Sequence, residues 1–254
     1  MAAPRKIENR IRLDELLVAR GLYATRSRAR DAIERGAVIV DGTVAGKPGH
    51  AVAPDCTIGV DDPAARYVSR AALKLVAGLD HFGLDPGGSE ALDIGASTGG
   101  FTQVLLERGA SHVTAIDVGH GQLDPGLRDD PRVAVIEGLN ARDLSAADLD
   151  GKRPDFLACD VSFISLTLAL PPALGLAAPG AKAVFLVKPQ FEAGREAIGK
   201  GGILKDPAEG PRIAEKLRTW LDAQPGWRAL GTCPSPVAGG DGNREFLLGG
   251  RKDR

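Results

Sequence analysis

Residues 92–101 of this chain read LDIGASTGGF. A short apolar run passes into a glycine-rich turn and then into a helix-forming stretch, which is how a doubly wound α/β sheet opens a cofactor site at the carboxyl end of a strand. Gly95 allows a sharp turn, and we expect Gly99 and Gly100 to let the backbone approach a bulky ligand. Asp93 adds a carboxylate, expected at the mouth of the site, which would repel a pyrophosphate and attract the amine of a methionine-type cofactor.

Three chemistries compete for this turn. Residues 95–99 match the G-x-S-x-G elbow of serine hydrolases, which also need a histidine later in the chain. The C-terminal half has no histidine, because the four are His50, His81, His112 and His120. The G-x-G-x-x-G pattern of nicotinamide sites requires glycine where this chain has Ser97. A methyl-donor site is the third interpretation.

Asp117 bears on the choice between the two cofactors. It ends an expected strand over residues 113–116, at roughly the distance past the turn where an acid accepts hydrogen bonds from ribose hydroxyls. Such an acid serves a nicotinamide cofactor or S-adenosylmethionine equally well. Asp93 and the glycine spacing favour S-adenosylmethionine.

Composition limits the classes of partner. The 254 residues carry a formal net charge of −1 and are 43% hydrophobic. The charge is uneven, since residues 1–54 have an excess of four positive charges and the remainder has five negative. A basic head favours a local attraction to phosphate. Three cysteines without a CxxC pair indicate neither a disulfide framework nor a metal site.

Targeting signals are lacking in the sequence pattern. The N-terminus has no apolar signal core, and prolines, glycines and a lysine interrupt the longest apolar region, residues 163–187. We therefore expect a soluble, cytoplasmic protein with no membrane partner, and no protein partner is predicted.

The basic head has its own pattern. Helices are expected over residues 12–20 and 26–35, the second capped by Thr25 or Ser27, followed by a strand over 37–40 and a hairpin turn. We expect a small α+β domain over residues 1–62 and a linker over 63–68. Its candidate RNA-binding residues are Arg12, Arg26, Arg28, Arg30 and Arg35.

Residues 69–254 alternate between helix and strand signals. Such alternation predicts an α/β fold with a mostly parallel, Rossmann-like sheet. The two late strands, with no long helix between them, predict an antiparallel last strand. The expected helices are 69–82, 100–108, 166–177 and 207–222, and the expected strands are 91–94, 112–116, 133–136, 155–159, 182–187, 228–232 and 244–248.

Two ionisable residues follow buried strands of this sheet. Asp160 follows residues 156–159 and Lys188 follows 183–187, so both should lie at the carboxyl edge beside the glycine turn. A lysine there is costly unless paired, and Asp160 is its natural partner, either as a plain ion pair or as part of a catalytic group. A lysine held near carboxylates suits methylation of a ribose hydroxyl, which must lose its proton as the methyl group arrives. Periodicity does not place Glu245 or Lys74.

Several strings in this order resemble the TlyA family, in which an RNA-binding domain of the ribosomal-protein-S-four type is fused to an FtsJ-like ribose methyltransferase. The resemblance spans residues 11–248. The strings are RLD (12–14), TRSRA (25–29), YVSRAALKL (67–75), DIGASTGGFT (93–102), DVSFIS (160–165), KPQFE (188–192) and GKGG (199–202).

The resemblance implies an enzyme that transfers a methyl group from S-adenosylmethionine to a ribose 2′-hydroxyl of cytidine in ribosomal RNA or ribosomal subunits. It implies a catalytic tetrad of Lys74, Asp160, Lys188 and Glu245, with Lys188 activating the hydroxyl. Cofactor contacts are implied for Asp93, Gly95, Ala96, Ser97, Gly99, Gly100, Asp117, Asn140, Asp143 and Asp160.

Two other classes of function stay open at this point. One is a non-catalytic assembly factor with a relic cofactor pocket, against which the intact tetrad argues. The other is a membrane-lytic protein, because members of the family carry an older haemolysin label. The interrupted apolar region argues against that class.

Overall fold

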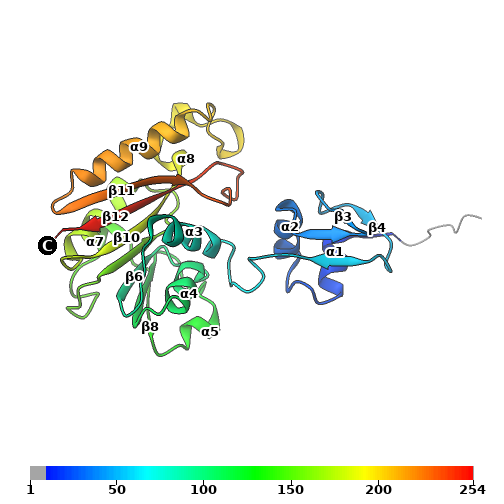
Figure 1. Cartoon of the computed structure of the whole chain (residues 1–254), viewed down its shortest axis with the longest axis horizontal. Helices are drawn as coiled ribbons and strands as arrows, with labels where there is room; N and C mark the ends of the chain where they lie inside the picture. The colour runs from blue at the N-terminus through cyan, green and yellow to red at the C-terminus, as the bar shows by residue number, and fades with distance from the viewer. Residues whose placement is uncertain (1–9, 254) are drawn as a thin grey trace, which may run out of the picture. The chain divides into compact units, whose positions relative to one another are not determined.

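The computed structural model describes residues 10–253 (Figure 1). The chain divides into two compact units, Met1–Arg66 and Tyr67–Arg254, here called the N-terminal and C-terminal units. Tyr67 is buried in the core of the C-terminal unit, and the backbone N–H of Val68 donates to Gln103 Oε1 of the same unit.

The N-terminal unit is a small α+β fold, as the sequence predicts. Its core joins one face of each helix to the central strand β2, and Thr25 caps α2 by accepting a hydrogen bond from the Arg28 N–H. Strand β2 lies between β3 and β5 in an antiparallel sheet, and β1 pairs with β4. The elements are β1 (Ile11–Arg12), α1 (Leu13–Ala19), α2 (Arg26–Glu34), β2 (Val38–Val40), β3 (Thr43–Val44), β4 (Ala51–Val52) and β5 (Ile58–Val60).

Asp62 closes the end of this unit. Its carboxylate accepts hydrogen bonds from the Arg35 guanidinium at 2.8 and 2.9 Å and from the Tyr23 hydroxyl at 2.9 Å. The Ala64 N–H donates to the same carboxylate. Burial alone would raise the pKa of Asp62, but the hydrogen bonds from Arg35, Ala64 and Tyr23 outweigh it and hold the pKa below its ordinary value. The ionised carboxylate therefore stabilises the fold.

Asp62→Asn is expected to destabilise the N-terminal unit by about 1–3 kcal/mol at neutral pH. A carboxyl whose pKa is lowered by folding contributes stability above its unfolded pKa of about 3.9, and this is lost as the pH falls through the folded value. The difference in the free energy of unfolding between wild type and variant should therefore shrink below about pH 4. Amide hydrogen exchange of α2 and β2 in the full chain measures this free energy. Asp61→Asn is the matched control, and a pH-independent difference would contradict the assignment.

The C-terminal unit is a seven-stranded sheet in the order β11-β12-β10-β9-β6-β7-β8. Within this sheet, β12 runs in the opposite direction to the other six strands and pairs antiparallel with both β10 and β11. The last strand is antiparallel, as predicted, but it inserts between β10 and β11, so that β11 forms the edge. The strands are β6 (Glu90–Ile94), β7 (His112–Asp117), β8 (Val133–Glu137), β9 (Phe156–Cys159), β10 (Lys182–Val187), β11 (Trp227–Pro234) and β12 (Phe246–Lys252).

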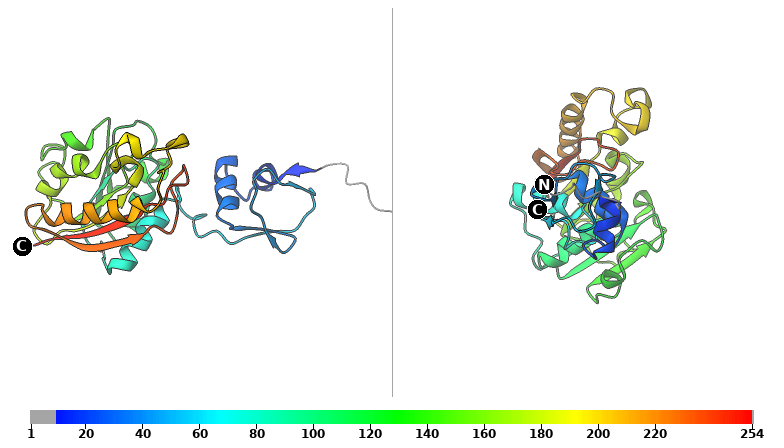
Figure 2. Two further views of the ribbon diagram at one scale, coloured as in Figure 1. Left: turned by 90° about the horizontal axis from the view of Figure 1, so that it is seen from above. Right: turned by 90° about the vertical axis from the view of Figure 1, so that its right-hand side faces the viewer.

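Helices cover both faces of this sheet. Alternate strand residues face opposite layers, so Leu157 packs with α6, α7 and α9, whereas Phe156 packs with α3 and α4. The two edge-on views of Figure 2 show α9 and α3 on opposite sides of β11 and β12. The helices are α3 (Ala72–Phe82), α4 (Gly100–Glu107), α5 (Pro125–Arg128), α6 (Leu166–Ala169), α7 (Pro171–Leu176), α8 (Pro189–Glu192) and α9 (Glu209–Asp222), with 3₁₀ turns at Ala141–Asp143, Arg195–Ala197 and Lys200–Gly202.

Two predicted helices differ from the structure. The helix expected over residues 166–177 is broken into α6 and α7, because Pro171 and Pro172 cannot donate the backbone hydrogen bonds that would continue it. The helix expected from Ser69 begins at Ala72 instead. Ser69 accepts a hydrogen bond from the Ala71 N–H and forms the turn before the helix. Between residues 10 and 253, no helix is long and apolar enough to cross a bilayer.

The order and direction of the strands bring residues that are far apart in the sequence to one edge of the sheet. The parallel strands β6, β7, β9 and β10 all end at one edge of the sheet, here called the carboxyl edge. Because β12 runs the other way, it begins at that edge, and its first residue, Phe246, lies opposite Val187. Glu245 and Lys188 are therefore brought to neighbouring positions, which is why periodicity alone could not place Glu245.

Candidate active site

The glycine turn after β6 leaves no room for a side chain at three of its positions. Gly95 has φ +83°, and a Cβ there would lie 2.8 Å from the carbonyl oxygen of Asp160. At Gly99, with φ +97°, a Cβ would overlap the Leu127 side chain, and at Gly100 it would lie 3.0 Å from Ser69 Cβ. The expectation that these last two glycines let the backbone approach a ligand stays a prediction. In the structure, a Cβ at either position would meet neighbouring protein groups that fix the start of α4.

Asp93 lies beneath the turn, and the expectation that it stands at the mouth of the site is wrong. It is fully buried, because it points to the face of β6 that α4 covers. The Thr102 hydroxyl donates to Asp93 Oδ2 at 2.6 Å, and Oδ1 has no partner among the described residues. Burial raises the pKa of Asp93 to about 7. Through its hydrogen bond with Thr102 of α4, Asp93 thus joins the strand before the turn to the helix after it.

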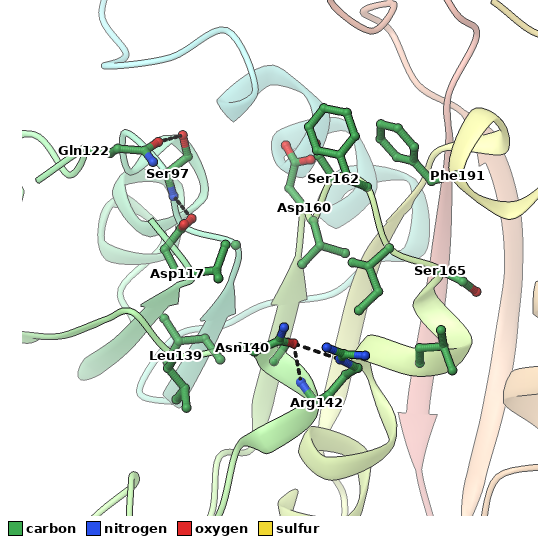
Figure 3. A pocket seen from close by; sticks show the side chains of 18 residues that line it. Ser97, Asp117, Gln122, Leu139, Asn140, Arg142, Asp160, Ser162, Ser165 and Phe191 are labelled. Carbon is green, nitrogen blue, oxygen red and sulfur yellow. Dashed lines mark hydrogen bonds between the residues drawn. The ribbon is translucent and has the colours of Figure 1, made fainter. Parts of the chain in front are cut away.

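Asp117 ends β7 and faces a cavity (Figure 3). Its two carboxylate oxygens accept hydrogen bonds from the Ser97 N–H at 2.8 Å and the Gly119 N–H at 2.7 Å. Ser97 has φ +47°, and its hydroxyl donates to Gln122 Oε1 at 3.1 Å. Each carboxylate oxygen keeps a lone pair for a further donor, which suits the ribose hydroxyls of a nucleoside.

The cavity has a volume of about 730 Å³. It opens between the glycine turn, Asp117 and the segment after β9. Asn140 lines it and accepts hydrogen bonds from Arg142, whereas Asp143 lies exposed outside the lining (Figure 3). Of the two residues predicted near an adenine, the structure therefore places only Asn140 at the cavity.

A second hollow of about 170 Å³ adjoins the first and shares Gly95, Ser97, Asp160 and Ser162 with it. Ala96 and Gly100 also line it, and Lys188 reaches it from the end of β10. Together the two hollows form a groove that runs from Asn140 to Lys188. The larger part can take a nucleoside, and the smaller part lies against the ionisable residues.

Lys188 and Asp160 form an ion pair at the carboxyl edge. The Lys188 ammonium lies 2.5 Å from Asp160 Oδ1 and donates a hydrogen bond to the Ser162 hydroxyl at 2.8 Å. The Lys188 and Asp160 side chains are only 11% and 15% exposed. The pairing expected from the strand ends is present in the structure.

Lys74 and Glu245 form a second ion pair close to the first. Lys74 Nζ of α3 lies 2.5 Å from Glu245 Oε2, and both side chains are buried. Burial raises the pKa of Glu245, and Lys74 opposes that rise most strongly, followed by Lys188. Because Glu245 feels the charges of both Lys188 and Asp160, the two pairs form one electrostatic group.

Three residues beside the groove were not singled out from the sequence. Phe163 is 91% exposed with φ +65°, and its ring lies 5.0 Å from that of Phe191. Glu192 accepts hydrogen bonds from the Ser165 hydroxyl at 2.6 Å and the Leu166 N–H at 2.8 Å. All three lie inside the strings DVSFIS and KPQFE or at their ends, but no spacing rule assigns them a task.

The candidate arginines of the N-terminal unit fall into two groups. Arg12 and Arg26 bind the buried carboxylate of Asp14, and both also approach Glu15. Arg35 pairs with Asp31 and Asp62, so it has a structural part in the fold. Arg30 is exposed on α2, and Arg28 is half-buried two residues earlier.

Comparison with known proteins agrees with both units. Residues 67–252 match the FtsJ-like methyltransferase family, and residues 11–57 match the S4 domain. The chain is 46% identical to the 16S/23S rRNA (cytidine-2′-O)-methyltransferase TlyA of Mycobacterium tuberculosis over 94% of this chain and 89% of that protein. It is 39% identical to Hemolysin A of Brachyspira hyodysenteriae over 93% of this chain and 98% of that protein.

A solved structure adds a likeness in three dimensions. This chain is similar to the solved structure of a candidate hemolysin from Streptococcus thermophilus, with a TM-score of 0.74 and 40% identity. The match covers 96% of this chain and 89% of that protein. The family matches, the identities and the shared architecture agree with each other. The chain belongs to the TlyA family, in which an S4 domain precedes an FtsJ-like methyltransferase domain.

Proposed function

We propose that this protein transfers a methyl group from S-adenosylmethionine to a ribose 2′-hydroxyl of ribosomal RNA, at a cytidine, and that it acts on RNA or ribosomal subunits in the cytoplasm. The observation that carries the proposal is the ion pair of Lys188 with Asp160 at the end of a nucleoside-sized groove, together with the buried pair of Lys74 and Glu245 whose charges act on it.

The groove fits S-adenosylmethionine. Asp117 retains acceptor capacity for the ribose hydroxyls, and Asn140 lies where the adenine would be held. The turn at Gly95, Ala96 and Ser97 would lie along the cofactor, with Asp160 at its methionine end. Bound there, S-adenosylmethionine would supply an electrophilic methyl group. Asp93 contributes from below by fixing the turn through Thr102.

Lys188 is the residue placed to handle the proton of the attacking hydroxyl. A ribose hydroxyl is a weak nucleophile at neutral pH and must lose its proton as it attacks. In its amine form, Lys188 Nζ would accept a hydrogen bond from the ribose hydroxyl and take its proton as the O–H bond breaks, and Asp160 stabilises the resulting ammonium. Lys74 and Glu245 support Lys188 and the bound ribose from a buried ion pair, whose charges act on Lys188 and Asp160. Much of the acceleration comes from this positioning.

The N-terminal unit supplies RNA affinity through its exposed arginines. Arg12 and Arg26 are partly neutralised by Asp14 and Glu15, so the exposed Arg30 of α2 carries the more available charge, with Arg28 two residues before it. Phosphate contacts from such side chains release counterions, and RNA affinity then falls as salt rises.

The double variant Arg28→Ala/Arg30→Ala is expected to weaken RNA affinity and to reduce the slope of log K against log salt by about one to two units. Affinity for S-adenosylmethionine alone should be unchanged, because the groove lies in the C-terminal unit. Filter binding across a salt series measures the first quantity and calorimetry the second. Arg218→Ala, on α9 between Glu215 and Asp222, is the control. Unaltered RNA affinity would count against the N-terminal unit as the RNA-binding part.

The proposed activity is tested with purified protein, tritiated S-adenosylmethionine and ribosomal subunits from a strain lacking this enzyme. We expect label in the RNA that depends on both the protein and the cofactor. Cofactor binding without transfer to any ribosomal RNA would support an assembly factor in place of an enzyme. Calorimetry with S-adenosylmethionine, performed on the same preparation, separates these outcomes.

A further inference from the structure

We propose that Ser162 is a positioning residue for Lys188, and that the segment 161–165 is built to hold its hydroxyl there; the inference rests on the proposed methyl transfer. Ser162 is not one of the four ionisable residues of the site. Its hydroxyl is nevertheless a direct partner of the Lys188 ammonium, at 2.8 Å.

The geometry around Lys188 Nζ explains why one partner would be insufficient. A lysine ammonium has three N–H groups on a flexible stem, and a single ion pair leaves it free to rotate. The ion pair with Asp160 and the hydrogen bond to the Ser162 hydroxyl hold Nζ from two sides, which leaves one direction open. That direction is available for the substrate hydroxyl, because Lys188 and Ser162 line the same hollow.

Both partners suit a proton transfer, because Ser162 accepts a hydrogen bond from Lys188 and Asp160 balances its charge. The amine form of lysine has two N–H groups and one lone pair, and the ammonium form has three N–H groups. The Ser162 hydroxyl accepts from one N–H group in either form, so the lone pair of the amine stays available for the proton of the substrate hydroxyl. Ser162 therefore keeps contact with Lys188 before and after the proton arrives, and the amine is held at one point throughout the reaction.

The backbone around Ser162 is held in an unfavourable shape. Phe163 has φ +65°, a conformation that costs a bulky residue free energy and persists only where surrounding contacts impose it. Glu192 of α8 holds the next part of this segment, because its carboxylate accepts hydrogen bonds from the Ser165 hydroxyl and the Leu166 N–H. The same α8 begins directly after Lys188. Glu192 thus ties the segment that carries Ser162 to the helix that follows its partner.

The test compares Ser162→Ala with Ser162→Thr in the full-length protein, using tritiated S-adenosylmethionine and ribosomal RNA. We expect kcat of Ser162→Ala to fall by about 10- to 100-fold, the range for a hydrogen bond to a charged group. The dissociation constant for S-adenosylmethionine and the KM for RNA should change little. Ser162→Thr should recover most of kcat, because it restores the hydroxyl at an exposed position.

A further measurement and a control variant separate positioning from a general loss of structure. NMR relaxation of the Lys188 ζ-ammonium should show greater mobility in Ser162→Ala than in wild type or in Ser162→Thr. Ser111→Ala serves as the control, since Ser111 makes two backbone hydrogen bonds before β7, at the opposite edge of the sheet.

Three outcomes would overturn the inference. Wild-type kcat in Ser162→Ala would remove Ser162 from the reaction while leaving the proposed function intact. An equal loss in the alanine and threonine variants, accompanied by weaker cofactor binding, would show that Ser162 only shapes the groove. Absence of transfer by the wild-type protein would overturn the proposed function and this inference together.

Discussion

Lys188→Ala is expected to lower the rate of methyl transfer by about 10²- to 10⁴-fold, the usual contribution of a positioned acid or base. The variant removes the Nζ that pairs with Asp160 and donates to Ser162 at the hollow next to the glycine turn. Affinity for S-adenosylmethionine should survive, because Asp117 and Asn140 hold the nucleoside elsewhere in the groove. Single-turnover transfer and calorimetry measure the two effects separately.

Two companion variants sharpen this result. Lys188→Arg keeps a positive charge but cannot give up or take a proton near neutral pH, so it should remain inactive if Lys188 accepts the hydroxyl proton. Lys182→Ala is the matched control, since Lys182 begins the same strand at the opposite edge and donates to the Asp85 carbonyl. Substantial activity in Lys188→Arg would assign Lys188 an electrostatic task, and full activity in Lys188→Ala would remove it from the mechanism.

Lys74→Met is expected to destabilise the C-terminal unit by about 3–5 kcal/mol and to abolish transfer. It leaves Glu245 buried without its main counter-charge. Burial already raises the pKa of Glu245, and loss of Lys74 raises it further. A carboxyl whose folded pKa is raised loses stability as the pH rises through that value, so the variant should be less unstable in acid than in alkali.

Urea unfolding followed by tryptophan fluorescence measures this effect, because both tryptophans, Trp220 and Trp227, lie in the C-terminal unit. The double variant Lys74→Met/Glu245→Leu should regain stability but not activity, since an apolar pair of similar volume replaces a buried ion pair without leaving a lone charge. Wild-type stability in Lys74→Met would show that the contact is accessible to water and not the buried pair described above.

Much of the fold follows from local sequence signals. The apolar run before Gly95, the glycine turn and the alternation of helix and strand predict the central sheet and its carboxyl edge, and β6 and α4 occur where expected. Lys188 and Asp160 could be paired because each directly follows a buried strand. These positions depend on short, wholly apolar runs that are each followed directly by an ionisable residue.

Other features depend on contacts between distant segments. Glu245 reaches the site only because β12 inserts antiparallel beside β10, and strand order is not encoded in periodicity. Asp93 was expected to face the ligand, but the pleat of β6 turns it toward α4. Arg35 looked like one of several surface arginines until the structure showed Asp62 against it. For Glu245 and Arg35 the deciding partner lies far away in the sequence, and for Asp93 it is the helix that follows the turn.

Alkaline hydrolysis of the labelled RNA tests ribose methylation most directly. A 2′-O-methyl group blocks cleavage at its own linkage, because alkaline cleavage requires a free 2′-hydroxyl as the attacking group. RNA methylated by the wild-type protein with tritiated S-adenosylmethionine should therefore release its label in an alkali-resistant dinucleotide. Label in ordinary mononucleotides would mean that a base is methylated, and it would contradict the assignment of Lys188 and Asp160 to a ribose hydroxyl.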